Sequence, residues 1–134
     1  MRVYLSGGMS GVRHFNLEAF DELARTLRGR GFEVVSPAEM DGDEARAILM
    51  TSEHGSHSDL PPGETWGWYL ARDIRLLADD GIEAVVVLPE WETSKGARLE
   101  VFMANQILGL PIFQYIDPGL IELSPWAILE GVRR

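Results

Sequence analysis

The chain has 134 residues, with 21 Asp and Glu against 12 Lys and Arg, so its formal net charge is −9 at pH 7. This acidic balance argues against a broad contact with the phosphate backbone of a nucleic acid polymer. Cysteine is absent, which excludes disulfides, thiolate metal sites and cysteine nucleophiles. No apolar run approaches the roughly 20 residues of a membrane helix, and we expect one soluble cytoplasmic domain over residues 1–134, away from membranes.

The N-terminal part of the chain predicts a strand, a glycine-rich loop, a helix and a second strand. Residues 2–5 are rich in apolar side chains and lead into SGGMSG, residues 6–11, which is typical of a buried strand that ends in a loop. Apolar residues at helical spacing follow over residues 17–31, with Asn16 before them as the helix cap. The run FEVVSP, residues 32–37, predicts a short strand that its proline closes.

Residues 38–63 show no clear periodicity. They contain one possible helical turn, DEARAILM at 43–50, and then TSEHGSHSDLPPG at 51–63, a run rich in Ser, His, Gly and Pro. Long irregular segments in compact domains are often functional. We therefore predict an irregular loop insertion at about residues 41–63 that covers a site.

The second half of the chain predicts two further pairs of helix and strand and a last helix. Residues 64–81 carry apolar side chains on one side of a helix, and the nearly all-apolar run at 82–89 predicts a central strand covered on both faces. A helix over 94–109, a strand over 110–116 and a short helix over 124–134 complete the chain.

Strands and helices that alternate over short connections predict an α/β fold. We expect an open, mostly parallel, flavodoxin- or Rossmann-like sheet with helices on both faces. In such sheets ligands bind at the carboxyl ends of the strands, where the strand order changes direction. This places the loops after Leu5, Val35 and Leu88 around one crevice.

The glycine-rich loop is the first candidate for a binding site. Glycines behind a strand can turn backbone N–H groups toward a bound anion, and Ser6 and Ser10 add hydroxyl donors. The loop matches neither the dinucleotide fingerprint nor the P-loop, so a structural turn is an equal alternative.

The helix predicted over residues 94–109 has one acidic residue on an otherwise apolar face. That residue is Glu100; the apolar positions on the same face are 97, 101, 104, 107 and 108. A carboxylate there needs a hydrogen-bond partner, a raised pKa or a place at the edge of the face beside a cavity. A partly solvated Glu is the common situation, but the position just after a strand's carboxyl end favours a site.

The start of the same helix is a second candidate for anion binding. Ser94 is the natural cap, and Gly96 allows the backbone to approach a ligand closely. Capping alone would also explain the serine.

Two other groups of residues have structural alternatives. Asp73 has Arg72 and Arg75 as possible ion-pair partners. His54, His57 and Asp59 lack the i, i+4 spacing of helical metal ligands, so we expect no metal there.

Three segments resemble the nucleoside 2-deoxyribosyltransferase superfamily: YLSGGMSG, WYLARDIRLLADDGIEAVVVLP and SKGARLEVFMANQILGLPI. The superfamily includes relatives that hydrolyse 2′-deoxynucleoside 5′-monophosphates and compact phage and bacterial members. The most specific element is a Ser with a Gly two residues later and a Glu six residues later, behind an apolar strand. Here these residues are Ser94, Gly96 and Glu100.

The resemblance implies roles for several residues. Glu100 would be the nucleophile that attacks the anomeric carbon, Asp73 would assist protonation of the departing base, and Tyr4 would orient the nucleophile. Together with Ser6, the residues that would bind the substrate are Gly7, Gly8, Ser10, Ser94 and Gly96.

From this resemblance we expect an enzyme that breaks the N-glycosidic bond of 2′-deoxyribonucleosides or their 5′-monophosphates through a covalent deoxyribosyl-Glu intermediate. The sugar would pass to another base or to water, with no cofactor and no metal. The partners implied are the deoxynucleoside or deoxynucleotide substrate and further copies of the chain in a dimer or larger homo-oligomer. The alternatives are a non-catalytic domain that binds or senses nucleotides on the same scaffold, and an interaction module built on Trp66, Trp68 and Trp126.

Overall fold

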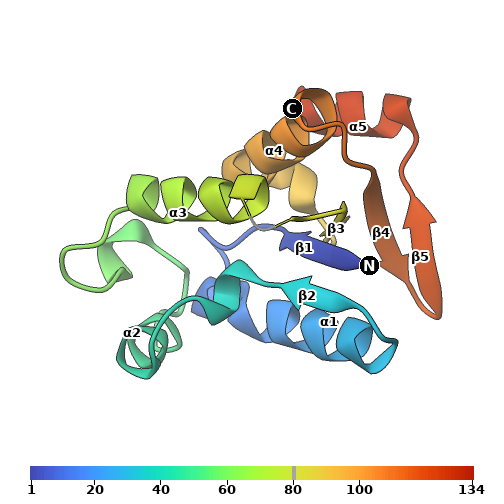
Figure 1. Ribbon diagram of the computed structural model, residues 1–134. Coiled ribbons are helices and arrows are strands. Elements are labelled where there is room, and N and C mark those ends of the chain that lie inside the picture. Colours follow the sequence, from blue (N-terminus) through green and yellow to red (C-terminus); the bar gives the residue numbers. More distant parts are fainter. Residues whose placement is uncertain (80) are drawn as a thin grey trace.

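The computed structural model describes residues 1–79 and 81–134, and its central element is one β-sheet (Figure 1). The strands are β1 (Arg2–Ser6), β2 (Glu33–Val35), β3 (Ala84–Val87), β4 (Ile112–Ile116) and β5 (Gly119–Glu122). Their order in the sheet is β2-β1-β3-β4-β5. The pairs from β2 to β4 are parallel, and only β4 with β5 is antiparallel among the described strands. The prediction of a mostly parallel α/β sheet is therefore confirmed.

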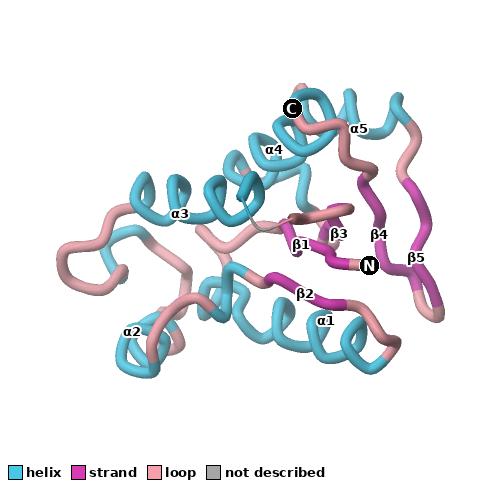
Figure 2. Tube along the Cα trace, viewed as in Figure 1, coloured by secondary structure: helices cyan, strands magenta, loops and turns pink. Residues whose placement is uncertain are grey.

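Helices cover both faces of the sheet (Figures 1 and 2). They are α1 (Leu17–Gly29), α2 (Asp43–Leu49), α3 (Trp66–Asp79), α4 (Lys95–Phe102) and α5 (Pro125–Val132). α1 lies on one face, while α3, α4 and α5 lie on the other. In the described part of the chain no helix has the length and apolar character needed to cross a membrane.

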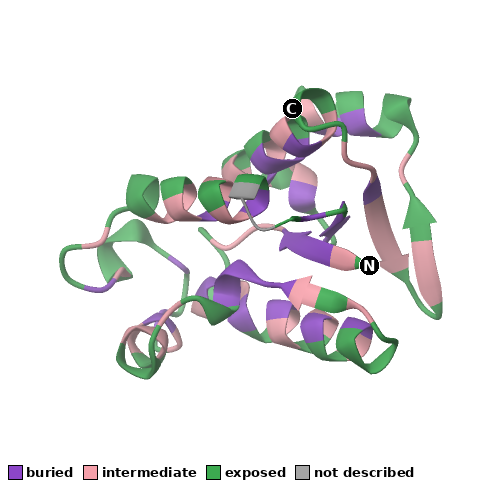
Figure 3. Cartoon of the chain, viewed as in Figure 1, coloured by how far each residue is buried: buried purple, intermediate pink, exposed green. Residues whose placement is uncertain are grey.

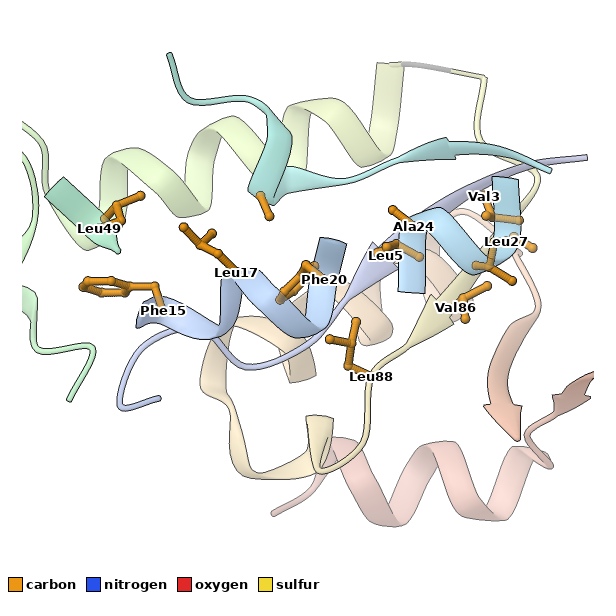
Figure 4. Close-up of a cluster of buried hydrophobic side chains, with 12 residues drawn as sticks. Val3, Leu5, Phe15, Leu17, Phe20, Ala24, Leu27, Leu49, Val86 and Leu88 are labelled. Atoms are coloured by element: carbon orange, nitrogen blue, oxygen red, sulfur yellow. The ribbon is translucent and has the colours of Figure 1, made fainter. Parts of the chain in front are cut away.

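The alternation of side chains along β1 divides the core into two layers. Successive residues of a strand point to opposite faces, so Val3 and Leu5 pack in the cluster beneath α1, and Tyr4 packs in the cluster beneath α3 and α4. Figure 4 shows the α1 layer, in which Leu5 and Phe20 lie among the buried side chains. Figure 3 shows that β1 and β3 are mostly buried, which confirms the predicted central strand, although the strand spans Ala84–Val87 and not the whole of 82–89.

The segment between β2 and α3 packs against the glycine-rich loop. It contains α2 and a short 3₁₀ turn at His57–Asp59. Gly11 N donates to Gly55 O over 2.9 Å, and His14 N donates to Ser52 O over 2.8 Å. These hydrogen bonds join two segments about forty residues apart in the sequence, beyond the carboxyl end of β1.

Three details differ from the sequence predictions. Asn16 does not cap α1 with its side chain, because its backbone has a positive φ of 62° and its amide donates to Gly8 O instead. The predicted helix 94–109 is α-helical only to Phe102 and continues as a π-helical turn, Met103–Ile107. A π-turn is wider than an α-turn, so Ile107 and Leu108, predicted on the apolar face, are exposed. Strand β5 had no clear signal in the sequence.

Candidate functional site

A pocket opens at the carboxyl ends of β1 and β3, where the strand order changes direction. Parallel sheets bind ligands at such points. Three loops meet there, after β1, after β2 and after β3, and the N-terminal half of α3 and the segment around α2 extend beyond the sheet beside them (Figure 1). The empty volume is about 630 Å³, including the part open to solvent. The lining residues that are also candidates from the sequence are Gly7, Ser10, Trp66, Asp73, Ser94, Gly96 and Glu100.

Glu100 projects from the second turn of α4 to the wall of the pocket. It is only 6% exposed, and Ser6 Oγ donates a hydrogen bond to its Oε1 over 2.7 Å. Ser6 is the last residue of β1 and shares a face with Tyr4, so the pleat of the strand aims its hydroxyl at α4. Burial, and after it the negative charge of Asp73, raise the pKa of Glu100 to about 8, while Ser6, Tyr4 and Arg72 oppose the shift.

The Glu100 carboxyl therefore meets every one of the alternative requirements that its place on an apolar helical face predicts. Glu100 has a hydrogen-bond donor, a raised pKa and a place beside a cavity. A carboxylate that pointed into bulk solvent would have none of these features. Its burial in the wall of a pocket is the property that a proton-transfer or nucleophilic role requires.

Tyr4 lies beneath Glu100 in the centre of the sheet and has no exposed surface. Among the described residues its hydroxyl has no hydrogen bond of regular geometry, although it lies close enough to Glu100 for the two groups to shift each other's pKa. Burial, and then the charge of Glu100, raise the pKa of Tyr4 well above its ordinary value. Tyr4 is therefore a neutral phenol beside the carboxyl group.

Asp73 lies on α3, across the pocket from α4, and is also only 6% exposed. Arg72 Nε donates to its Oδ1 over 3.0 Å, which is the ion pair that the sequence suggested; no pair with Arg75 is found in the described part of the chain. Burial raises the pKa of Asp73 to about 6, against the opposing effect of Arg72. The charge of Asp41 adds to the increase.

Glu100 and Asp73 form a coupled pair of acids. The charge of Asp73 disfavours ionisation of Glu100, so the two protons leave in separate steps. With pKa values of about 6 and about 8, the pair carries one proton across the neutral range. Such a pair can present a nucleophilic carboxylate and a proton donor to the same ligand.

The glycine-rich loop and the start of α4 form one rim of the pocket. Ser94 Oγ accepts a hydrogen bond from Ala97 N over 3.2 Å, as a helix cap. A Cβ on Gly7 would lie 2.7 Å from Leu88 Cβ, so packing alone requires glycine there. A Cβ on Gly8 would lie 3.4 Å from Ser94 Cβ, which shows how closely the two candidate anion-binding segments approach each other.

Charge at the pocket comes from acids and not from bases. Of the described residues that line it, two are acidic and none is Lys or Arg. A phosphate at this rim would therefore depend on backbone N–H groups and on the hydroxyls of Ser10 and Ser94. The Ser6 hydroxyl is already hydrogen-bonded to Glu100.

Most of the apolar wall was not recognised in the sequence. Met9, Phe15, Pro37, Leu49, Leu60, Tyr69, Leu70 and Ala97 line the pocket. They come from the glycine-rich loop, the turn before α1, the segment between β2 and α3, α3 itself and α4, and no local pattern connects them. The only signal was the length of the irregular segment, whose residues Leu49 and Leu60 do reach the pocket.

Two of the three residues considered as metal ligands, His57 and Asp59, have other partners. His57 Nε2 lies 2.9 Å from Ser10 Oγ, and its ring stacks on Trp66 with the centroids 6.0 Å apart. Asp59 accepts a hydrogen bond from Ser52 over 2.7 Å. Within residues 1–79 and 81–134, no group of His, Asp and Glu is arranged to hold a metal ion.

A family model described as a domain of unknown function, DUF4406, matches residues 1–114. The match includes every candidate site residue and ends within β4. Comparisons with curated proteins and with solved structures give no match.

Proposed function

We propose that this chain, which belongs to the DUF4406 family, cleaves the N-glycosidic bond of 2′-deoxyribonucleosides or their 5′-monophosphates. The observation on which we base the proposal is the buried Glu100 carboxyl, which faces a pocket together with a second acid, Asp73. Support also comes from the resemblance to nucleoside 2-deoxyribosyltransferases, because Ser94, Gly96 and Glu100, which carry its most specific motif, all line this pocket.

In the first step Glu100 forms a covalent bond to the sugar. One oxygen of the ionised carboxylate attacks C1′ while the bond from C1′ to the base nitrogen breaks. The electron pair of that bond leaves with the base, which takes the proton from Asp73. The products are a deoxyribosyl ester of Glu100, a neutral base and an ionised Asp73.

In the second step the sugar leaves the ester. Water, or a second base, attacks C1′ and gives a proton to Asp73, and Glu100 departs as a carboxylate. Positive charge develops on the sugar in both transition states, and a carboxylate in a dry pocket stabilises it strongly. A 2′-deoxy sugar lacks the electron-withdrawing hydroxyl and reaches this cationic state more readily.

The protonation states of the two acids predict how the reaction depends on pH. The reactive form has one proton, on Asp73, whereas in the free protein that proton resides mainly on Glu100, whose pKa is the higher of the two. We expect kcat/KM to rise as the pH passes about 6 and to fall above about 8, because the singly protonated pair predominates only between these values.

Base release measured by chromatography tests the proposal. The purified protein is incubated with each common deoxynucleoside and each deoxynucleoside 5′-monophosphate, alone and with a free acceptor base. Free base or a new nucleoside is the expected product. A deoxyribosyl adduct on the peptide that contains Glu100, found by mass spectrometry of quenched samples, would identify the intermediate.

Two variants make the result specific. Glu100→Ala should lower turnover roughly 10⁴-fold or more, as removal of a nucleophile does, while far-ultraviolet circular dichroism shows an unchanged fold. Glu122→Ala, which removes an exposed acid of β5 away from the pocket, should leave turnover unchanged. If no compound releases base, the enzyme proposal is wrong; binding without release, measured by calorimetry, would favour a nucleotide-binding domain.

Assembly into a homo-oligomer is part of the proposal. Large apolar side chains are exposed on α4 and α5, including Phe102 at 41% and Trp126 at 78%. Exposed apolar surface of this kind is often covered by another subunit. Light scattering of the wild type and of Trp126→Ala measures the mass in solution, and a monomeric wild type would contradict this part.

A further inference from the structure

Asp73 is hydrogen-bonded to Arg72, although these two neighbouring positions of α3 do not face each other. Arg72 and Asp73 are consecutive in α3, and consecutive side chains of a helix point in directions about 100° apart. Their hydrogen bond of 3.0 Å therefore requires the Arg72 side chain to turn toward Asp73. Something outside α3 must hold the guanidinium in that direction.

The segment that follows β2 supplies this support. Arg72 Nη1 donates to Asp41 Oδ1 over 3.0 Å, and Nη2 donates to Pro37 O over 3.1 Å. The guanidinium carbon also lies 4.9 Å from the centre of the Tyr69 ring and 5.6 Å from that of Trp68, as in cation–π contacts. All three guanidinium nitrogens thus have acceptors, in three different directions.

The side chain of Asp41 is buried, although the residue as a whole is half-buried. Its side chain is 3% exposed, and its second oxygen, Oδ2, has no hydrogen-bond partner among the described residues. A buried carboxylate oxygen without a partner is unfavourable for the fold. Asp41 and Asp73 therefore share one positive charge, and the group of three side chains has an excess negative charge when both acids are ionised.

On the basis of the proposed function, we propose that Arg72 and Asp41 are positioning residues that set the orientation and the charge of Asp73. Neither residue lines the pocket, so each acts through Asp73 and does not touch the substrate. Arg72 holds the carboxyl and favours its ionised form. Asp41 holds Arg72, competes for its charge and favours the protonated form that donates to the base.

The groups that face Asp73 come from four elements. They are Arg72 on α3 itself, Asp41 after β2, Glu100 on α4 and Tyr4 on β1. Arg72 lowers the pKa of Asp73 and Asp41 raises it. Since the two positioning residues act with opposite sign, their removal should have opposite effects, whereas damage to the packing would shift Asp73 in the same direction in both variants.

Carbon-13 NMR of protein labelled at aspartate carboxyl groups measures the titration of Asp73, which Asp73→Asn identifies. In Arg72→Gln the midpoint should rise above the wild-type value near 6, and in Asp41→Asn it should fall below that value. Arg75→Gln, an exposed arginine one turn from Arg72, is the matched control and should leave the midpoint unchanged.

The acidic limb of the kcat/KM profile should move in the same two directions, with KM for the substrate changed less than kcat. Midpoints that do not move, or that move in one direction in both variants, overturn the inference. If Arg72→Gln does not fold, the isosteric Asp41→Asn decides alone, a lower midpoint supporting the inference and any other result opposing it. The NMR titration does not depend on turnover. An inactive wild type would therefore refute the proposed function, while the midpoints of Asp73 would still test the positioning roles of Arg72 and Asp41.

Discussion

At the scale of single residues, the Glu100 carboxylate depends on one hydroxyl, that of Ser6. This is the only hydrogen bond of regular geometry to Glu100 among the described residues, and it stabilises the ionised form. Ser6→Ala should therefore raise the pKa of Glu100 above about 8. We expect the alkaline limb of the kcat/KM profile to move to higher pH and the maximum rate to fall, because the proton resides even more on Glu100.

The control for this variant is Ser10→Ala. Ser10 also lines the pocket, but its hydroxyl contacts His57 and not Glu100. Its loss should leave the alkaline limb in place. An unchanged limb in Ser6→Ala would show that the hydrogen bond does not control the charge of Glu100.

Tyr4 allows a test in which stability and activity separate. Its buried hydroxyl has no hydrogen bond of regular geometry among the described residues, so Tyr4→Phe removes an unsatisfied polar atom and keeps the ring. We expect the free energy of unfolding in urea to stay the same or to rise by up to about 1 kcal/mol, while turnover falls. A loss of more than about 1 kcal/mol would indicate that the hydroxyl makes a real hydrogen bond to Glu100.

At the scale of elements, the wall of the pocket depends on how the segment between β2 and α3 packs on the glycine-rich loop. Gly55 lies at this junction with φ of +62°, and a Cβ there would lie 2.3 Å from Val12 O. Gly63, in the same segment, has φ of +82° and nothing within 4 Å of such a Cβ. The two glycines share the backbone strain of a substitution, but only Gly55 has the steric clash.

This pair predicts a difference between two alanine variants. Gly63→Ala should lower the free energy of unfolding by about 1 kcal/mol, the cost of a left-handed backbone. Gly55→Ala should cost more than that and should also weaken substrate binding, because Leu49 and Leu60 of the displaced segment line the pocket. Equal decreases in the free energy of unfolding, measured in urea, would mean that the structure around Gly55 relaxes and removes the steric clash.

At the scale of the whole molecule, the two buried acids link stability to pH. Their pKa values in the folded state, about 8 for Glu100 and about 6 for Asp73, lie above the ordinary values of 4.5 and 3.8. Between these limits the folded chain binds more protons than the unfolded chain, so the free energy of unfolding must fall as the pH rises. The stabilisation is fully present below about pH 4 and is lost as the pH passes about 8.

Urea unfolding at several pH values between 5 and 8 measures this effect. One extra bound proton gives a slope of about 1.4 kcal/mol per pH unit. In Glu100→Gln the slope between pH 6 and 8 should become much smaller, because the side chain of residue 100 no longer binds a proton in this range. A wild type whose stability is constant or rises over this range would contradict the raised pKa of Glu100.

Short-range patterns in the sequence predict most of the helices and strands and single out Glu100. The strands β1 to β4 and the helices follow from periodicity within short windows, and Glu100 was found because one polar residue interrupts an apolar helical face. Such patterns depend on residues a few positions apart, whose relative placement is fixed by the geometry of the helix or strand. The same locality explains the errors, since the π-turn at Met103–Ile107 changes the helical period without a signal in composition.

The contacts between side chains far apart in the sequence follow from the tertiary fold. Ser6 and Glu100 are 94 positions apart, and Arg72 and Asp41 are 31 apart. These contacts depend on the order of the strands, on their register and on the path of an irregular segment, and each is set by packing summed over the whole chain. The candidate acids and the Arg72–Asp73 pair could therefore be read from the sequence, but the donor to Glu100, the groups that hold Arg72 and the apolar wall of the pocket could not.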